Sequence, residues 1–569
     1  MTRCPVCGRA VSLWMNSLRT KLVPRFVGLG AFLMPPLVRA QDVAESFRRE
    51  SSGLQFWDWA VIAGYLCIVL GMGWFYSRRQ SDNQEYFIAG QRHIHPILIG
   101  ISLYATLLST ISYLGKPGEM INRGPMLLIG QIMAVPISFV VVGYFIIPRL
   151  MRERVTSAYE LLEQRLGVSA RLLGAGLFVG LRLIWMGLLI YLTSVALVVI
   201  IGLELKWTPW ISLVTGLVAV IYTSMGGLRT VVITDVFQFG LLFLGALLGI
   251  GIVTINLKGF GWIPTEWSPH WDRQPWFSLD PHVRVTMFGT IVSLGLWQIA
   301  TAGGDQTAVQ RFMATSSARA ARRSYLINAI AVIVVTVVQA FLGLALLGFY
   351  TQIPDALGPG MTVEGYGDHL FPYFIAHHLP VGLSGLVVSA VMAAAMSSID
   401  SGVNSITAVV VRDFLPRLRR RPTTAAAEVR FSKWIAFGIG SLVVLASLFM
   451  QYVPGNFVEM TSRTANLLVV PIFMLFVFAL WVPFATPLGV LLGTAYGLAT
   501  ATFIGFWDGL TDGEPLSFQW MGAGALVVNL AVGLAISRFG PARENVRDTR
   551  RVGAIGTCVL AAIVFVLIR

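Results

Sequence analysis

The chain has 569 residues, of which 56% are hydrophobic and only 12% are charged. Soluble domains carry about 25% charged residues, so this composition excludes an ordinary soluble protein. The net charge of +14 does not indicate nucleic-acid binding, because the basic residues cluster in alternate loops between apolar segments. Apolar runs close to the ~20 residues of a membrane-spanning helix recur from about residue 57 onward. We therefore predict an all-α polytopic membrane protein with about 13–14 transmembrane helices.

The N-terminal segment has the features of a secretory signal peptide. Residues 18–42 combine a basic flank, an apolar stretch too short to span a bilayer, and a candidate cleavage site at Val38-Arg39-Ala40. We predict a signal peptide over residues 1–40, with Met15 as an alternative start and an uncleaved anchor helix as the alternative structure. The Cys pair at 4–7 lacks the second pair that a zinc site needs, and the four cysteines imply no disulfide framework.

The expected spans follow in chain order. A first, peripheral span covers 57–77, and the next segment, 93–120, is broken by Gly and Pro in GKPGEM at 115–120. The remaining spans are expected at 125–150, 170–201, 208–224, 231–255, 285–304, 325–350, 381–412, 430–451, 465–484, 486–507, 519–537 and 552–568. The aromatic-rich loop at 256–284 between them is expected at the outer interface.

Without the first span, the ten spans from 93 to 484 form two groups of five, at 93–255 and 285–484, followed by additional C-terminal spans within 485–569. An odd number of spans per group inverts the second group relative to the first, as in many secondary transporters. The chain has no Walker A or kinase motif, so an ion gradient is the energy source that the sequence allows.

The distribution of basic residues predicts the orientation. The loop from Thr351 to Pro380 contains no Lys or Arg, whereas basic stretches follow alternate spans, at 77–80, 149–154, 318–324, 417–422 and 542–551. By the positive-inside rule, these basic loops face the cytoplasm and the mature N-terminus lies outside. We expect a multi-pass protein of a bacterial-type inner membrane.

A polar stripe interrupts the apolar segment near residue 400. In AAAMSSIDSGVNS, at 393–405, Ser397, Asp400, Ser401 and Asn404 share one helical face. Sodium prefers such oxygen ligands, whereas the alternative for the serines is simple helix packing. The intramembrane carboxylate of Asp400 favours a functional site.

Other spans carry polar residues that also fit ordinary packing or a helix start. The hydroxyls of Ser109 and Ser112 lie one turn apart before the Gly-Pro break, and Asp235 lies near the start of its span. The other members of this set are Thr106, Gln131, Gln238, Gln298, Thr301, Asp305 and Gln306.

Three motifs occur in the order and spacing of a known family: GGLRTVVITDVFQ, DQTAVQRFMA and AAAMSSIDSGVNSITAVVVRDF. On these motifs the chain resembles the sodium:solute symporter family over about residues 57–540. YATLLSTISYLGKPGEM and VTSAYELLEQRLG are similar to its bacterial sialic-acid branch. The resemblance implies a leucine-transporter-like 5+5 inverted repeat, with Na⁺ as coupling ion and no other cofactor.

The resemblance also implies two ion sites. The shared sodium site would use the backbone carbonyls of Ala105, Leu108 and Ala394 and the hydroxyls of Ser397 and Ser398. A second site found in some members would match Asp235, Ser397, Asp400 and Ser401. Because Asp400 stands where the sialic-acid branch has a hydroxyl, either a sodium ion or a proton remains open for this second site.

By the same resemblance, the substrate would contact Ser109, Ser112, Gln131 and Gln298. The arginine that holds the substrate carboxylate in the sialic-acid branch aligns with Trp185, and Arg182 lies about 4.5 Å earlier along the helix axis. Either Arg182 replaces that arginine, or the substrate has no carboxylate and Trp185 stacks on a sugar ring. Sialic-acid-like compounds, neutral sugars or polyols, and other organic anions or amino acids remain open.

The sequence thus predicts a sodium-coupled importer of a small polar organic solute, and not an enzyme. The alternatives are a proton-coupled carrier, a sodium-independent uniporter or channel, and a transport-like sensor. A membrane enzyme would need a motif that joins its histidines, and none joins His93, His95, His377 and His378. The expected partners are the solute, sodium and the lipid bilayer, with no nucleic acid and no prediction of oligomeric state.

Overall fold

The computed structural model describes residues 54–78, 94–153, 157–225, 227–264, 266–269, 271, 275–358, 360–418, 424–452, 457–511 and 513–540. All regular elements of these residues are helices. The predicted signal peptide, His93 and the last predicted span at 552–568 lie outside the described residues.

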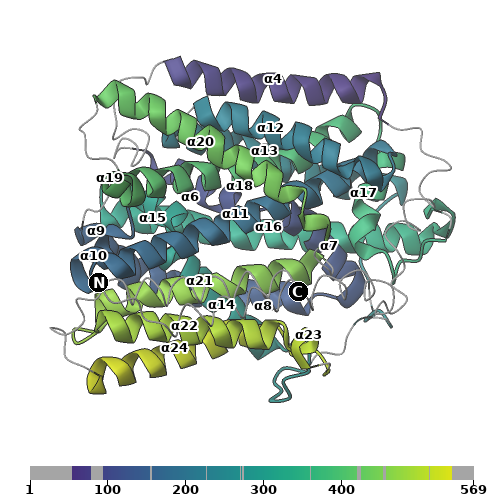
Figure 1. Cartoon of the computed structure of the whole chain (residues 1–569). Helices are drawn as coiled ribbons and strands as arrows, with labels where there is room; N and C mark the ends of the chain where they lie inside the picture. Colours follow the sequence, from purple (N-terminus) through teal and green to yellow (C-terminus); the bar gives the residue numbers. More distant parts are fainter. Residues whose placement is uncertain are drawn as a thin grey trace, which may run out of the picture.

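The long helices lie side by side with roughly parallel axes (Figure 1). They are α4 (Phe56–Arg78), α8 (Met126–Val140), α11 (Val168–Ile201), α12 (Thr208–Met225), α13 (Leu228–Asn256), α14 (Met287–Gly304), α16 (Ala318–Gln352), α18 (Leu383–Val409), α20 (Ala425–Ser447), α21 (Phe457–Trp481), α22 (Pro487–Gly505) and α24 (Gln519–Phe539). The shorter helices are α6 (Pro96–Leu107), α7 (Thr110–Arg123), α9 (Ile147–Glu153), α10 (Glu160–Leu166), α15 (Gln306–Met313), α17 (Gly367–His377), α19 (Leu415–Leu418) and α23 (Trp507–Thr511). Single turns complete the set: η1 (Val141–Ile146), η2 (Leu205–Trp207), η3 (Pro354–Ala356), η4 (Val410–Phe414) and η5 (Met450–Tyr452).

Within the described residues, ten helical segments are long and apolar enough to cross a membrane, and the bent pair α6–α7 raises this to eleven. Helices α14 and α21 occupy two further predicted spans, and α14 carries polar residues such as Gln298 that lower its hydropathy. The predicted polytopic all-helical fold is therefore confirmed up to residue 540.

Helix α18 is the most deeply buried candidate span of the described chain: 94% of its most apolar window is buried, against 22% for α4. Small residues permit this position, because a side chain at Gly385 or Gly402 would collide with α4 or α11. The polar stripe of α18 therefore faces protein on all sides rather than lipid.

The first broken helix has its break earlier than the sequence predicted. Helices α6 and α7 meet at a 62° bend. Leu108 ends α6, and the Ser109 side chain accepts a hydrogen bond from the Ser112 backbone N–H to begin α7. The predicted break at GKPGEM is wrong, because α7 continues through Pro117. The serine cap satisfies one of the free N–H groups of the new helix, which favours a helix start at this bend.

A second break separates α14 from α15. Asp305 ends α14 in an extended conformation, and its Oδ1 accepts from the Thr307 N–H at 2.8 Å to begin α15. The bent pair α6–α7 and the pair α14–α15 are the first helices of the two predicted groups of five. Discontinuous helices at matching positions are typical of an inverted-repeat transporter fold.

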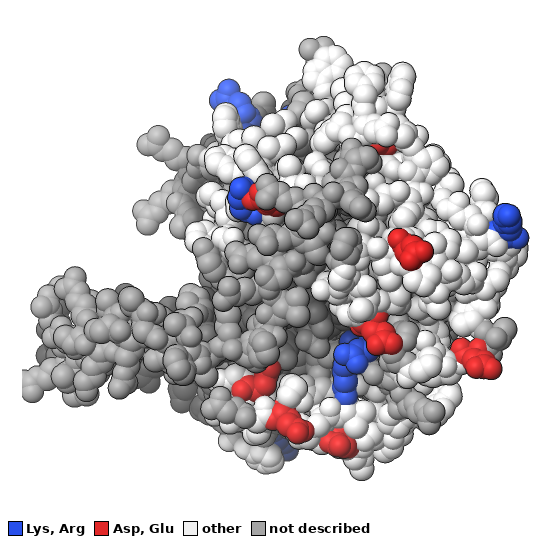
Figure 2. Space-filling model, turned by 90° about the vertical axis from the view of Figure 1, so that its right-hand side faces the viewer, with Lys and Arg blue, Asp and Glu red and all other residues white. Residues whose placement is uncertain are grey.

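The two ends of the molecule differ in their helices and surface. Helices α7 and α17 reach one end, whereas α9, α10, α15 and α19 lie at the other (Figure 1). On the α17 end, most of the charged side chains visible among the described residues are acidic (Figure 2). This end includes the loop that the sequence analysis found to lack Lys and Arg.

The contact between α4 and α18 yields a stability prediction. Asp58 Oδ1 accepts from the backbone N–H groups of Gly382 and Gly385 at 2.7 and 2.9 Å. A Cβ atom at Gly385 would lie 2.4 Å from the Asp58 backbone oxygen. We expect Gly385→Ala to lower the free energy of unfolding by about 1–3 kcal/mol through overpacking.

The matched control is Gly64→Ala in α4, where no heavy atom lies within 4 Å of the added methyl group. This change is expected to be neutral or slightly stabilising, because alanine favours a helix. Unfolding in detergent would measure both variants, and an equal effect of the two would contradict the packing argument.

Candidate functional site

A central cavity of about 200 Å³ brings together side chains from eight helices, and five of the six predicted substrate residues line it. These five are Ser112, Gln131, Arg182, Trp185 and Gln298. The sixth, Ser109, is not among the lining residues, but its Oγ lies 3.4 Å from that of Ser112.

Several buried polar atoms of the cavity wall have no hydrogen-bond partner among the described residues. Buried polar groups are normally satisfied, so each of these atoms calls for a partner from elsewhere. They are Tyr104 Oη, Arg182 Nε, Gln298 Nε2, Thr301 Oγ1, Thr307 Oγ1 and Asn328 Oδ1. Together with the indole rings of Trp185 and Trp297, they suit a polar solute that has a ring or another flat apolar face.

Arg182 is not free to act alone as a carboxylate anchor. Its Nη2 donates to Asp305 Oδ2 across the break between α14 and α15, and both side chains are buried. Asp305 therefore neutralises the arginine while it caps α15. Sequence reasoning placed Arg182 and Asp305 in separate spans and had no signal that would pair them.

The predicted sodium ligands meet where α6 ends against α18. Ser397 Oγ donates to the backbone oxygens of Ala105 and Ala394 at 3.0 and 3.2 Å. Ser398 Oγ donates to the Thr106 backbone oxygen at 3.0 Å. Leu108 ends α6 close by. Carbonyl oxygens released by the helix break thus face two hydroxyl groups of α18, next to the cavity that Thr106 and Leu108 also line.

Of the residues predicted for a second ion site, Asp235 and Ser401 meet, with the Ser401 Oγ 3.4 Å from Asp235 Oδ2. Ser397 belongs to the cluster just described, whereas Asp235 and Ser401 surround the guanidinium of Arg311. Arg311 Nη2 lies 3.0 Å from Asp235 Oδ2 and 2.5 Å from Ser401 Oγ, and Arg311 Nε donates to Ser102 Oγ at 2.9 Å. Arg311 and Asp235 are fully buried.

Arg311 is the residue that sequence reasoning missed most clearly. The sequence analysis identified DQTAVQRFMA as a family motif, but Arg311 precedes a basic loop and resembles a cytoplasmic anchor. The structure places it inside the helical body, where its charge occupies the predicted second site. The sequence did contain a signal for this pair. Asp235 lies in one span and Arg311 follows another, and both belong to family motifs.

Asp400 has its own direct hydrogen-bond partners, which differ from those of both clusters. It accepts hydrogen bonds from Tyr222 Oη and Thr223 Oγ1 of α12. Gln238 Nε2 lies 3.5 Å from the same tyrosine hydroxyl and 3.3 Å from Tyr65 Oη. No basic side chain forms an ion pair with Asp400 within the described residues. Whether Asp400 shares an ion site with Asp235 and Ser401 therefore stays a prediction.

Two charged contacts lie above the cavity, at the α17 end. Glu119 of α7 accepts from both terminal nitrogens of Arg284 at 3.0 Å. Asp368 packs directly on α7, since a Cβ atom at Gly118 would lie 2.1 Å from its Oδ1. Burial raises the pKa of Asp368 to about 7, with a further rise from the nearby Glu119 carboxylate and an opposing effect of Arg284. This carboxyl therefore changes its charge near neutral pH.

The chain is similar in sequence to one known protein family and to several of its members. Residues 86–497 match the sequence model of the sodium:solute symporter family. The sodium/sialic acid symporter SiaT of Proteus mirabilis (strain HI4320) is 31% identical over 409 residues, which cover 69% of this chain and 78% of that protein. The sodium/sialic acid symporter NanT of Aliivibrio fischeri is 29% identical over 456 residues, with coverage of 79% and 87%.

The similarity extends to a eukaryotic transporter and a solved structure. Sodium-coupled monocarboxylate transporter 1 of Mus musculus is 28% identical over 468 residues, which cover 80% of this chain and 74% of that protein. The solved structure of a Na⁺-coupled sialic acid symporter, in a substrate-bound outward-open state, superposes with a TM-score of 0.70 at 26% identity. That alignment covers 85% of this chain and 98% of the solved chain.

The Arg311–Asp235 pair generates a stability prediction. Arg311→Met leaves Asp235 as an unpaired buried charge, and breaking a buried pair costs about 3–5 kcal/mol. The double variant Arg311→Met/Asp235→Asn is expected to recover a large part of that loss. Unfolding of the purified protein in detergent measures both.

The control is Lys206→Met in the exposed Lys206–Glu204 pair, where the lysine side chain is 67% exposed. Such a surface pair contributes about 0–1 kcal/mol. If Arg311→Met cost no more than this control, the buried pair would not be a structural element of the folded state.

Proposed function

Because the chain belongs to the sodium:solute symporter family, we propose that it uses a sodium gradient to import a small polar organic solute across the bacterial inner membrane. The single observation that carries this proposal is the meeting of α6 carbonyl oxygens and α18 hydroxyls at a helix break beside the cavity. Sugars, sialic acid and related compounds are the solutes to test.

Sodium binding at this interface would couple the ion to the solute. The Ser397 and Ser398 hydroxyls bond to the end of α6, and a sodium ion among the same oxygens would replace these bonds. Thr106 and Leu108 contribute both to this interface and to the cavity wall. An ion that fixes the end of α6 therefore also fixes one wall of the solute site, which makes the two binding events favour each other.

We propose a stoichiometry of one sodium ion. A second cation at Asp235 and Ser401 would have to share its ligands with the Arg311 guanidinium, which already supplies a full positive charge there. Two cations a few Å apart in a buried site repel each other strongly. The arginine thus serves as a tethered cation in place of a second sodium ion.

The relatives support a ring-bearing or anionic solute. Two of them are named for sialic acid and one for monocarboxylates. The unpartnered donors and acceptors of the cavity wall, together with Trp185 and Trp297, fit a polyhydroxylated ring compound. Sialic acid is therefore the first solute to test, with neutral sugars next.

Uptake of labelled N-acetylneuraminate into proteoliposomes tests the function. An inward sodium gradient is expected to drive accumulation that a potassium gradient does not drive. The dependence of the initial rate on sodium concentration is expected to show a Hill coefficient of about 1. A coefficient near 2 would contradict the tethered-cation argument, and equal flux in both salts would indicate a uniporter.

One observation favours proton coupling as a second candidate function. Asp400 is fully buried and receives two hydroxyl hydrogen bonds without a basic partner among the described residues. A buried carboxylate in a span is a common carrier of protons. The same liposomes with a pH gradient and no sodium test it: accumulation there, abolished by Asp400→Asn, would replace sodium coupling with proton coupling.

The sodium site itself is tested by removing one hydroxyl at a time. Ser397→Ala and Ser398→Ala each delete a proposed ligand, so the sodium concentration for half-maximal uptake is expected to rise by at least about tenfold. The matched control is Ser389→Ala on the same helix, whose hydroxyl only donates to the Gly385 backbone oxygen. A control that shifts as much as the other two would show that the effect comes from α18 packing.

A further inference from the structure

We propose that Lys116 binds a carboxylate of the transported solute, which makes that solute an organic anion. This inference rests on the proposed function and deepens it. Neither the sequence analysis nor the family resemblance assigned a role to this residue. The argument depends on where the ammonium lies and on how the other charges around the cavity are paired.

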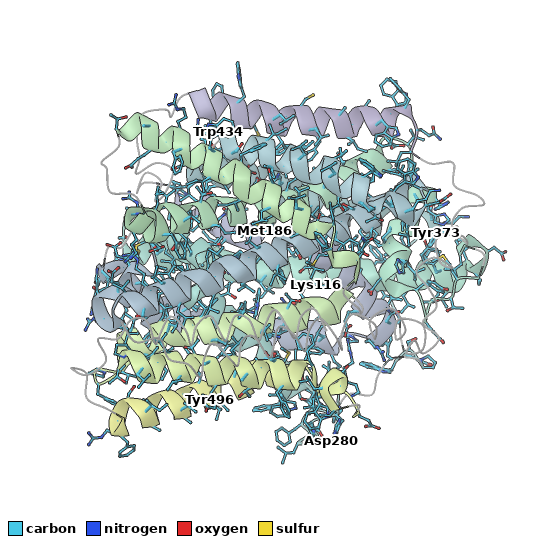
Figure 3. All side chains as sticks on the ribbon, viewed as in Figure 1. Lys116, Met186, Asp280, Tyr373, Trp434 and Tyr496 are labelled. Carbon is cyan, nitrogen blue, oxygen red and sulfur yellow. The ribbon has the colours of Figure 1, made fainter. Side chains whose placement is uncertain are left out.

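Lys116 lies on α7, about two turns after the helix break, and lines the cavity. Its label lies near the middle of the view in Figure 3, and the residue is partly buried. Its Nζ donates one hydrogen bond, at 3.1 Å, to Thr336 Oγ1 of α16. An ammonium has three donors, so this contact leaves two of them for a ligand.

The other charged side chains of the cavity wall already have partners of opposite sign. Arg182 is paired with Asp305, and both oxygens of Glu119 accept from Arg284. Lys116 forms no ion pair within the described part of the chain. Among the charged side chains that line the cavity, Lys116 is therefore the one without a partner of opposite sign in the described part of the chain.

An unpaired ammonium in a span is costly, and burial of a charge is stable only with compensation. A solute carboxylate would supply this compensation through a charge-assisted hydrogen bond, which is stronger than a neutral one. With a neutral sugar in the cavity, the Lys116 ammonium would keep its hydrogen bond to Thr336 but would have no negative partner. The cavity thus favours an anion over a neutral solute of the same shape.

This placement also explains how the chain manages without an arginine at position 185. Arg182 is committed to Asp305, and Trp185 offers an aromatic face. Lys116 lies on α7 and donates to Thr336 of α16, whereas Trp185 lies on α11. The solute carboxylate would lie at the α7–α16 wall and its ring would lie toward Trp185.

Binding to the purified full-length protein in sodium-containing detergent solution tests the inference. The probes are pairs that differ in a carboxylate: N-acetylneuraminate with N-acetylmannosamine, D-glucuronate with D-glucose, and lactate with 1,2-propanediol. In the native protein, the acid of at least one pair is expected to bind about tenfold or more tightly than its neutral partner. Lys116→Gln is expected to remove this preference, and Lys116→Arg is expected to retain most of it.

Lys206→Gln is the control, because it removes one positive charge at an exposed position away from the cavity. Stabilisation by sodium without any solute shows that each variant is folded and binds the ion. If that stabilisation is absent in the native protein, the proposed sodium coupling fails, while the solute-binding comparison still judges Lys116.

Three results would overturn the inference. One is that the neutral member of each binding pair binds as tightly as the acid. Another is that Lys116→Gln keeps the affinity for the acid while sodium still stabilises the variant. The third is that no acid of the panel binds to the native protein.

Discussion

A polar group inside a bilayer must find its partner within the protein, and the centre of this structure is arranged around that requirement. Helix α18 carries hydroxyls, a carboxylate and an amide, and it is almost completely enclosed by other helices. Its small residues let the neighbours approach closely enough to satisfy those groups. The central position of α18 is thus a consequence of its polarity as much as of its packing.

The enclosed polar groups of α18 contact three different sets of neighbours. Ser397 and Ser398 face the end of α6, Ser401 faces Arg311 and Asp235, and Asp400 faces α12. Consecutive residues on a helix point about 100° apart, so one short segment can serve several environments. A motif that reads as one stripe in the sequence is therefore divided among three sites in the structure.

This division explains how far the sequence could predict the molecule. Composition and apolar runs were sufficient for a polytopic helical fold, because bilayer thickness fixes the length of a span. The family resemblance, and not periodicity within single helices, predicted that Ser112, Gln131 and Gln298 share one cavity. The position of the first break was not predictable from Gly and Pro, because a serine cap at Ser109 decided it.

The pairing of charges was also beyond the sequence. Arg311 with Asp235, and Arg182 with Asp305, join residues from spans far apart in the chain, and periodicity within one helix carries no information about partners in another. Lys116 was overlooked for a related reason: within GKPGEM it reads as part of a helix breaker. Its significance lies in the lack of an acidic partner among the described residues, which only the arrangement of the surrounding charges can reveal.

Asp305 takes part in the break between α14 and α15 and in the cavity wall. Its neighbours Gly304 and Gln306 contact the segment around Tyr159, at the end of the molecule away from α17. Asp305 Oδ1 begins α15 and its Oδ2 holds Arg182 at the cavity wall. On either side of it, the Gly304 oxygen accepts from Tyr159 Oη, and Gln306 Oε1 accepts from the Ala158 N–H. Tyr159 and Ala158 belong to the VTSAYELLEQRLG motif, so these contacts give that motif a structural role at the helix break.

The same segment connects the break to the far end of α18. Ser157 Oγ donates to Asp413 Oδ2 in η4, and Arg171 bridges Asp413 and Glu163. A shift of α15 that opens a path from the cavity must therefore disturb the Arg182 pair and the contacts of the 157–167 segment together. The Arg182–Asp305 pair at the cavity wall and the packing of that end thus belong to one connected set of contacts, which the proposed transport cycle would need in order to couple solute release to a conformational change.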